Sequence, residues 1–173
     1  MWDDNDYAQN DGNKYFIYKD DVKKFYLNFL DEPINSERRR IGRGMYETYT
    51  FGDTLTHRSV RVILLDVRYH KTSLFDSNRD LLGEDQWSWL EDVLQSNNET
   101  FTFISSGTQI LPIDRLATEC WLPESRQRLF KLIAKLKKSG VILLTGDIHN
   151  GQILRTPCKI QGMNISIFIF AIY

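Results

Sequence analysis

Cysteine is scarce in this sequence. Its 173 residues include only Cys120 and Cys158, which lie far apart and form no C-x-x-C pair. These two could pair with each other, but they cannot build a disulfide framework, and they do not fix a redox compartment. An excess of positive charge is also missing, because the formal net charge is -1. This balance argues against a general nucleic-acid-binding protein, so no specific nucleic-acid partner is expected.

Long apolar runs, internal repeats and low-complexity tracts are absent as well. The apolar segment 164–173 has ten residues, too few to span a bilayer, so no transmembrane segment is expected. We interpret this segment as a strand of a buried sheet because it is rich in β-branched and aromatic residues. The alternative is a hydrophobic stub left by truncation or mis-splicing. No secretory signal peptide is recognisable at the start, and the residues assign no compartment and no oligomeric state.

The composition is that of a globular protein, with 42% hydrophobic and 26% charged residues, and the length suits one domain. Amphipathic helices alternate with apolar strands along the chain. The patterns predict helices over 19–30, 83–97 and 124–140, and strands over 45–52, 59–68, 100–107, 141–149 and 164–173. In the first helix, the apolar residues at helical spacing form one stripe, which consists of Val22, Phe25, Tyr26, Phe29 and Leu30. This alternation predicts an α/β fold with a mostly buried sheet.

Polar groups follow two of the predicted strands, at Asp66–Arg68 and at Gly146–His149. In α/β sheets, functional groups gather just beyond the carboxyl ends of the strands. Asp147 and His149 are two residues apart, so in extended backbone they would point to the same side and could share a metal ion. The alternative is a structural histidine at a strand end that is capped by an aspartate.

The segment WDDNDYAQND, residues 2–11, crowds four aspartates together. Their mutual repulsion must be offset by water, by a metal cation or by a basic partner. For Asp6 and Asp11 a solvated turn is an equal alternative, because Asn-Asp-Gly at 10–12 is a turn signal. Together with His149, the oxygen ligands of Asp4 and its neighbours suit manganese, iron or zinc, with calcium on an all-oxygen side.

Seven blocks, in order, carry a resemblance to a known family. They are WDDNDYAQNDG, YKDDVKKFYLNFLDEP, RGMYETYTFG, VRVILLDVRYHK, LLGEDQWSWLE, ISSGTQILP and LLTGDIHNGQI. Over about residues 2–161 the sequence resembles the PhoD-like metallophosphatases, the alkaline phosphatase D family of the calcineurin-like superfamily. The resemblance implies one partial domain over 1–173, in which 162–173 is a divergent or truncated tail. It also implies part of a four-layer α/β/β/α sandwich and a multinuclear metal centre.

What the resemblance implies for the site can be given residue by residue. Asp3, Asp4, Asp147 and His149 match metal ligands, and iron with calcium are the implied metals. Arg68 matches the arginine of the family's L-D-x-R block. It is expected either to neutralise a substrate phosphate or to orient Asp66, with a structural ion pair to Asp66 or a nearby acid as the alternative. Such a site hydrolyses phosphomonoesters or phosphodiesters with a metal-activated water.

The sequence also departs from the family pattern. Asn5 stands where many members carry histidine, and an amide can hydrogen-bond a phosphoryl oxygen but cannot deliver a proton. The family's earlier G-D-x-x-Y block has no counterpart here. The hydrolase therefore has two rivals, a non-catalytic remnant that serves as an α/β interaction module and a metal-free hydrolase that uses paired carboxylates. Members of the family are often secreted, which leaves the compartment of this chain open.

Overall fold

The fold is taken from a computed structural model of the chain. It describes residues 1–173 apart from 54, 57, 96–98, 112–118, 148, 150, 161–162 and 172–173, and it describes 155–160 and 163–171 by their backbone alone. Helices and strands alternate along the described chain, which confirms the predicted α/β class. None of the helices in this part of the chain is long and apolar enough to cross a membrane.

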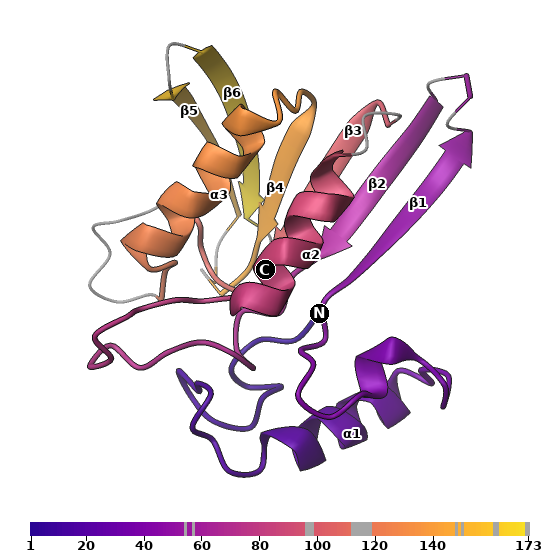
Figure 1. Cartoon of the computed structure of the whole chain (residues 1–173), viewed down its shortest axis with the longest axis vertical. Coiled ribbons are helices and arrows are strands. Elements are labelled where there is room, and N and C mark those ends of the chain that lie inside the picture. Colours follow the sequence, from indigo (N-terminus) through magenta and orange to yellow (C-terminus); the bar gives the residue numbers. More distant parts are fainter. Residues whose placement is uncertain are drawn as a thin grey trace.

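A six-stranded sheet forms the centre of the described structure (Figure 1). Its strands run in the order β1-β2-β3-β4-β6-β5. The four inner strands, β2, β3, β4 and β6, are parallel, and β1 and β5 pair antiparallel at the two edges. The bounds are β1 Glu47–Asp53, β2 Arg58–Leu64, β3 Phe101–Ser106, β4 Val141–Thr145, β5 Gln152–Ile160 and β6 Met163–Ala171.

Helices α2 (Glu84–Gln95) and α3 (Pro123–Lys135) cover one face of this sheet (Figure 1). They form the crossovers from β2 to β3 and from β3 to β4. Two successive crossovers of the same hand place both helices on the same face. Ile63, Ile104 and Leu143 point from the sheet into a core that these helices close. Trp87 is buried in this core, while Trp89 packs against its edge, with its ring tilted against that of Tyr46 at a centroid distance of 4.7 Å.

The opposite face of the sheet is also apolar. Strand register aligns Val62, Phe103 and Ile142 across β2, β3 and β4, and each is half-buried. On β1, Tyr49 pairs with Val62 and Phe51 with Val60, and both aromatic side chains are exposed. Among the described residues no helix lies over this face (Figure 1). The sheet and its single helical layer therefore make two of the four layers in the predicted sandwich.

The N-terminal segment and α1 (Lys19–Phe29) lie beyond the ends at which the parallel strands finish (Figure 1). A second, smaller core joins them to the sheet, and it consists of the buried side chains Trp2, Tyr7, Leu27, Met45 and Tyr69. A short 3-10 helix, η1 (Glu37–Arg39), follows α1. This small core fixes the first residues of the chain against the carboxyl ends of the strands.

The predicted apolar stripe of α1 is confirmed only in part, because Val22 and Tyr26 pack against the small core. Phe25 and Phe29 are exposed, whereas Leu27 and Lys23 are buried. The ammonium group of Lys23 donates hydrogen bonds to the carbonyl oxygens of Arg40 (2.7 Å) and Arg43 (2.8 Å). The helix therefore packs through Leu27, a hydrogen-bonded Lys23 and the stripe residues Val22 and Tyr26, whereas its phenylalanines face solvent.

Several boundaries also differ from the prediction. The strand at Gln152–Ile160 was not predicted, whereas 164–173 is a strand as far as Ala171, paired parallel to β4; the last two residues lie outside the described residues. Helix α3 ends at Lys135, five residues before Gly140. Lys137, with φ of 50°, takes the left-handed conformation that ends the helix. Cys120 carries a free thiol, and the side chain of its possible partner Cys158 lies outside the described part of the structure.

Candidate metal centre

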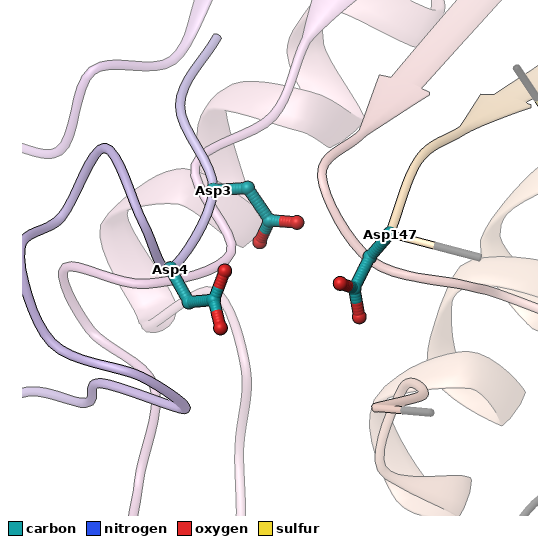
Figure 2. Close-up of side chains that lie close together, drawn as sticks. All are labelled: Asp3, Asp4 and Asp147. Carbon is teal, nitrogen blue, oxygen red and sulfur yellow. The ribbon is translucent and has the colours of Figure 1, made fainter. Parts of the chain in front are cut away.

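Three carboxylates from the two ends of the described chain meet at one point. Asp3, Asp4 and Asp147 each offer an oxygen atom, and these atoms lie within 4.8 Å of one another. Figure 2 shows Asp3 and Asp4 reaching in from the N-terminal segment, and Asp147 facing them from the turn after β4. Asp147 lies more than 140 positions after the adjacent Asp3 and Asp4 in the sequence, and the fold brings all three to a single cluster.

Trp2 anchors the segment that carries Asp3 and Asp4. Its side chain is 1% exposed, and its indole nitrogen donates to Asp66 Oδ1 at 2.9 Å. The phenol of Tyr26 donates to the carbonyl oxygen of Met1 at 2.8 Å. Gly107 permits the close approach, because a Cβ at this position would lie 2.9 Å from Asp3 Oδ1 and from the carbonyl oxygen of Trp2. The buried ring of Trp2 thus anchors the two aspartates, and Gly107 leaves the space that Asp3 occupies.

Backbone amides fix the carboxylate of Asp4. The Asn5 amide donates to Asp4 Oδ1 at 2.7 Å, and the Asp11 amide donates to Asp4 Oδ2 at 3.3 Å. Asp11 has φ of 52°, the left-handed conformation of a turn, and both Asp6 and Asp11 are exposed. These two residues therefore form the solvated turn that was one of the two alternatives. The side chain of Asn5 is exposed as well, and its backbone makes the contact with the cluster.

The segment after β4 does not continue as extended backbone. Strand β4 ends at Thr145, and Asp147 and His149 have φ of 64° and 55°. This region is sparsely populated by residues with a side chain, and such strain concentrates at functional sites. The expectation that an extended chain aligns the two side chains is therefore wrong. His149 nevertheless lines the same cavity as Asp4 and Asp147, although it lies outside the close group of three carboxylates.

Arg68 supports the cluster from behind. Its side chain is fully buried, and its Nε and Nη2 donate to Asp3 Oδ1 at 2.9 and 2.5 Å. The third nitrogen, Nη1, lies 2.5 Å from Glu119 Oε2. Only the backbone amide of Arg68 contacts the Asp66 carboxylate, at 2.9 Å. The guanidinium group therefore orients Asp3 and not Asp66, which corresponds to the predicted ion pair with a nearby acid.

Glu119 was not identified from the sequence. It contacts Arg68 and also Lys71, which is 8% exposed and lines the cavity. The surrounding sequence, ATECWLP, matches no motif, and Glu119 precedes α3 in a connecting segment. No local pattern could have indicated this glutamate, because its partners are about 50 residues away in the chain.

The electrostatics of the cluster favour added positive charge. Burial, followed by the charges of Asp3 and Asp4, raises the pKa of the Asp147 carboxyl to about 6. Burial also raises the pKa of Asp3, although the positive charge of Arg68 opposes this rise. Among the described residues, the side chains of Arg68 and Lys71 contact the carboxylates around the cluster, where Asp3, Asp4, Glu119 and Asp147 supply four. A bound metal cation would offset the remaining negative charge.

The donor set fits a metal ion. Carboxylate oxygens are the ligands of hard cations such as calcium, and one neighbouring imidazole extends the set toward iron, manganese or zinc. The cluster opens into a cavity of about 700 Å³ that is lined by Asp4, Asp147, His149, Lys71 and Glu119 on its polar side. The carboxylates of Asp4 and Asp147 are therefore accessible to a ligand from solvent.

Comparisons with known proteins agree with this arrangement. The family model of PhoD-like phosphatase matches residues 2–169 of the chain. Alkaline phosphatase D of Bacillus subtilis (strain 168) is 23% identical over 180 aligned residues, which cover 86% of this chain and 30% of that protein. A solved structure titled "Structure of PhoD" superposes with a TM-score of 0.78 at 19% identity, covering 99% of this chain and 38% of that one. The chain thus corresponds to about a third of each relative's length and to part of a larger fold.

Proposed function

The chain belongs to the PhoD-like phosphatase family, and from this premise we propose that it contributes part of the active site of a metal-dependent phosphate-ester hydrolase. The substrate class is a phosphomonoester or phosphodiester, and the nucleophile is a metal-activated water. Asp3, Asp4, Asp147 and His149 are the proposed metal ligands. The observation that carries the proposal is the meeting of three carboxylates within 4.8 Å at the carboxyl ends of the parallel strands.

A metal bound at this cluster would polarise the phosphoryl oxygens and lower the pKa of a coordinated water to near neutrality. The residues of the chain hold the geometry for that chemistry. Arg68 fixes one oxygen of Asp3, and two backbone amides fix both oxygens of Asp4, so the carboxylates are oriented before a cation arrives. Iron and calcium, which the family resemblance implies, are the proposed metals.

Lys71 supplies positive charge beside the cluster. Its ammonium group contacts Glu119 and lies 3.5 Å from the carbonyl oxygen of Asp11, on the wall of the cavity. Phosphoryl transfer depends on positioning and on charge stabilisation more than on covalent chemistry, so a cation in this place suits a phosphoryl oxygen. A contact between the Asn5 amide and the phosphoryl group stays a prediction, because the Asn5 side chain is exposed and its backbone contacts Asp4.

The proposal is tested by measuring metal content and activity together. The 173-residue chain is equilibrated with iron, zinc and calcium, dialysed, and analysed by inductively coupled plasma mass spectrometry. Hydrolysis of bis(p-nitrophenyl) phosphate and p-nitrophenyl phosphate is followed in the same samples. We expect bound metal and hydrolysis in the parent chain, and loss of both in the Asp147→Asn and His149→Ala variants.

The matched control is Asp92→Asn, which removes an exposed carboxylate from α2, away from the cluster. It should keep both the metal and the activity. A chain that binds no metal, or whose metal content is unchanged by Asp147→Asn, contradicts the proposal and favours the non-catalytic interaction module. Hydrolysis that survives a chelator would instead favour the metal-free hydrolase.

A further inference from the structure

The loop of residues 72–80 is closed at its base by its own hydrogen bonds. The Thr72 amide donates to the Asp80 carbonyl oxygen at 2.9 Å, and the Asp80 amide donates to Thr72 Oγ1 at 2.8 Å. The Thr72 hydroxyl returns a hydrogen bond to the same carbonyl oxygen at 2.9 Å. The loop starts one residue after Lys71, so its base is fixed beside the candidate metal centre.

The tip of this loop is held by the N-terminal segment. The carboxylate of Asp76 accepts hydrogen bonds from the phenol of Tyr15, at 3.1 Å to each oxygen, and lies 3.2 Å from the ammonium group of Lys14. Within the loop, the Ser73 amide donates to Asp76 Oδ2 at 3.2 Å. Contacts at base and tip therefore set the conformation of the residues between them.

Those residues, Leu74 and Phe75, are apolar and point into solvent. Leu74 is 67% exposed and Phe75 is 99% exposed, yet both line the cavity that contains Asp4, Asp147 and His149. Neither side chain contributes much burial to folding at these exposures. An ordered apolar pair beside a polar centre is typical of a site that receives a ligand with an apolar part.

We propose that Leu74 and Phe75 form an apolar platform for the organic group of the phosphate ester, which makes aryl and bulky alkyl phosphate esters the preferred substrate class. This inference rests on the proposed function, because the phosphate would lie at the carboxylate cluster. Leu122 lines the same cavity and adds apolar surface to it. The cavity, at about 700 Å³, has room for a phosphate together with one aromatic ring.

The test compares two non-hydrolysable probes, phenylphosphonate and methylphosphonate, by isothermal titration calorimetry in the presence of calcium and iron. They share the phosphonate group and differ in the apolar group. Stacking and burial of a ring predict that phenylphosphonate binds about fivefold to tenfold more tightly to the parent chain. We expect Phe75→Ala to reduce this preference to about twofold or less, and Phe75→Tyr to keep it, because the ring remains.

Phe29→Ala is the matched control, since Phe29 is also a highly exposed phenylalanine but lies on α1 and does not line the cavity. It should leave the preference unchanged. Equal affinity for the two probes in the parent chain, or no binding of either, overturns the inference. It is also overturned if Phe75→Ala changes only the sedimentation of the protein, because Phe75 would then belong to a contact between copies of the chain.

Hydrolysis measured in parallel separates this inference from the proposed function. If p-nitrophenyl phosphate is hydrolysed but Phe75→Ala does not alter the preference between the probes, the platform is wrong and the hydrolase stands. If no ester is hydrolysed while the parent chain prefers phenylphosphonate and Phe75→Ala loses that preference, the platform is supported and the hydrolytic function is contradicted.

Discussion

Strands β2 and β4 lie in the same parallel sheet, and each is followed two residues later by an aspartate. After β2, Asp66 is 1% exposed, and its carboxylate accepts from the indole of Trp2 and from the amides of Met45, Arg68 and Tyr69 at 2.7–3.0 Å. After β4, Asp147 has a left-handed backbone and faces the carboxylates of Asp3 and Asp4. One aspartate is surrounded by donors and the other by acceptors.

This difference indicates two roles for one residue type at one position of the fold. Asp66 accepts hydrogen bonds from three separate segments, so it ties the N-terminal segment and Met45 to the end of β2. Asp147 adds a third carboxylate beside Asp3 and Asp4, and burial together with their negative charges raises its pKa to about 6. The first arrangement stabilises the folded state, whereas the second costs stability until a cation binds.

The largest expected effect is that of Asp66→Asn. An amide places a donor where the carboxylate accepts, so at least one of its four partners loses its acceptor inside the protein. Hydrogen bonds to buried charged groups are worth enough that we expect the free energy of unfolding to fall by about 3–5 kcal/mol. Urea unfolding followed by circular dichroism measures the change, with Asp92→Asn as the control. A loss below about 1 kcal/mol would remove the contrast between the two aspartates.

Trp2→Phe should give the next largest effect. The ring stays in the small core, but the 2.9 Å hydrogen bond from the indole to Asp66 is lost. We expect the free energy of unfolding to fall by about 1.5–3 kcal/mol, the range for a hydrogen bond to a charged group. Combined with Asp66→Asn, the two losses should add to less than their sum, because they share one interaction. Strict additivity in this double-mutant cycle would show that Trp2 does not act through Asp66.

Asp147→Asn should affect stability least and metal binding most. With a chelator present, we expect the free energy of unfolding to change by less than about 1 kcal/mol, because the substitution removes repulsion and deletes no core contact. Metal affinity, measured by competition with a chromophoric chelator, should fall by at least about tenfold. If this variant were as unstable as Asp66→Asn, both aspartates would be structural and the comparison would fail.

The pH dependence of stability should show a small effect that belongs to Asp147. Its carboxyl takes up a proton near pH 6 in the folded protein and near its ordinary value of 3.8 in the unfolded chain. The folded state therefore binds more protons between these values, and this group adds stability below about pH 4 that is lost as the pH rises through 6. The metal-free Asp147→Asn variant should lack this part of the profile. Parallel profiles for the two proteins would contradict the raised pKa.

The fold class, and the meeting of Asp3 and Asp4 with Asp147, could be predicted from the sequence. Apolar runs of strand length, such as 59–68 and 141–149, and the helical spacing of Trp87, Leu90 and Leu94 depend on local periodicity, which a sequence displays. The expectation that polar residues after parallel strands converge depends on a general property of α/β sheets. The location of Asp147 and His149 at the cavity agrees with it, although the reason first given, an extended backbone, was wrong.

What could not be predicted depends on tertiary contacts. The phenylalanines of α1 have the spacing of a buried stripe, but they are exposed. The helix instead buries Lys23, whose ammonium group donates hydrogen bonds to two carbonyl oxygens. Glu119 and its contacts with Arg68 and Lys71 join segments about 50 residues apart. The left-handed turn at Asp147 comes directly after Gly146, where a Cβ would lie 2.8 Å from the carbonyl oxygen of Gly107. Local propensity contains none of this information.

The sheet face opposite α2 and α3 gives the described structure one apolar side. One side of the sheet is covered by helices (Figure 1). The other side presents Val62, Phe103 and Ile142 beside the exposed rings of Tyr49 and Phe51. A particle of this kind collects at air–water boundaries and on hydrophobic resin, and mild detergent competes for the same side. We therefore expect the 173-residue chain to be most tractable at low concentration with a non-ionic surfactant, conditions under which its chemistry can be measured.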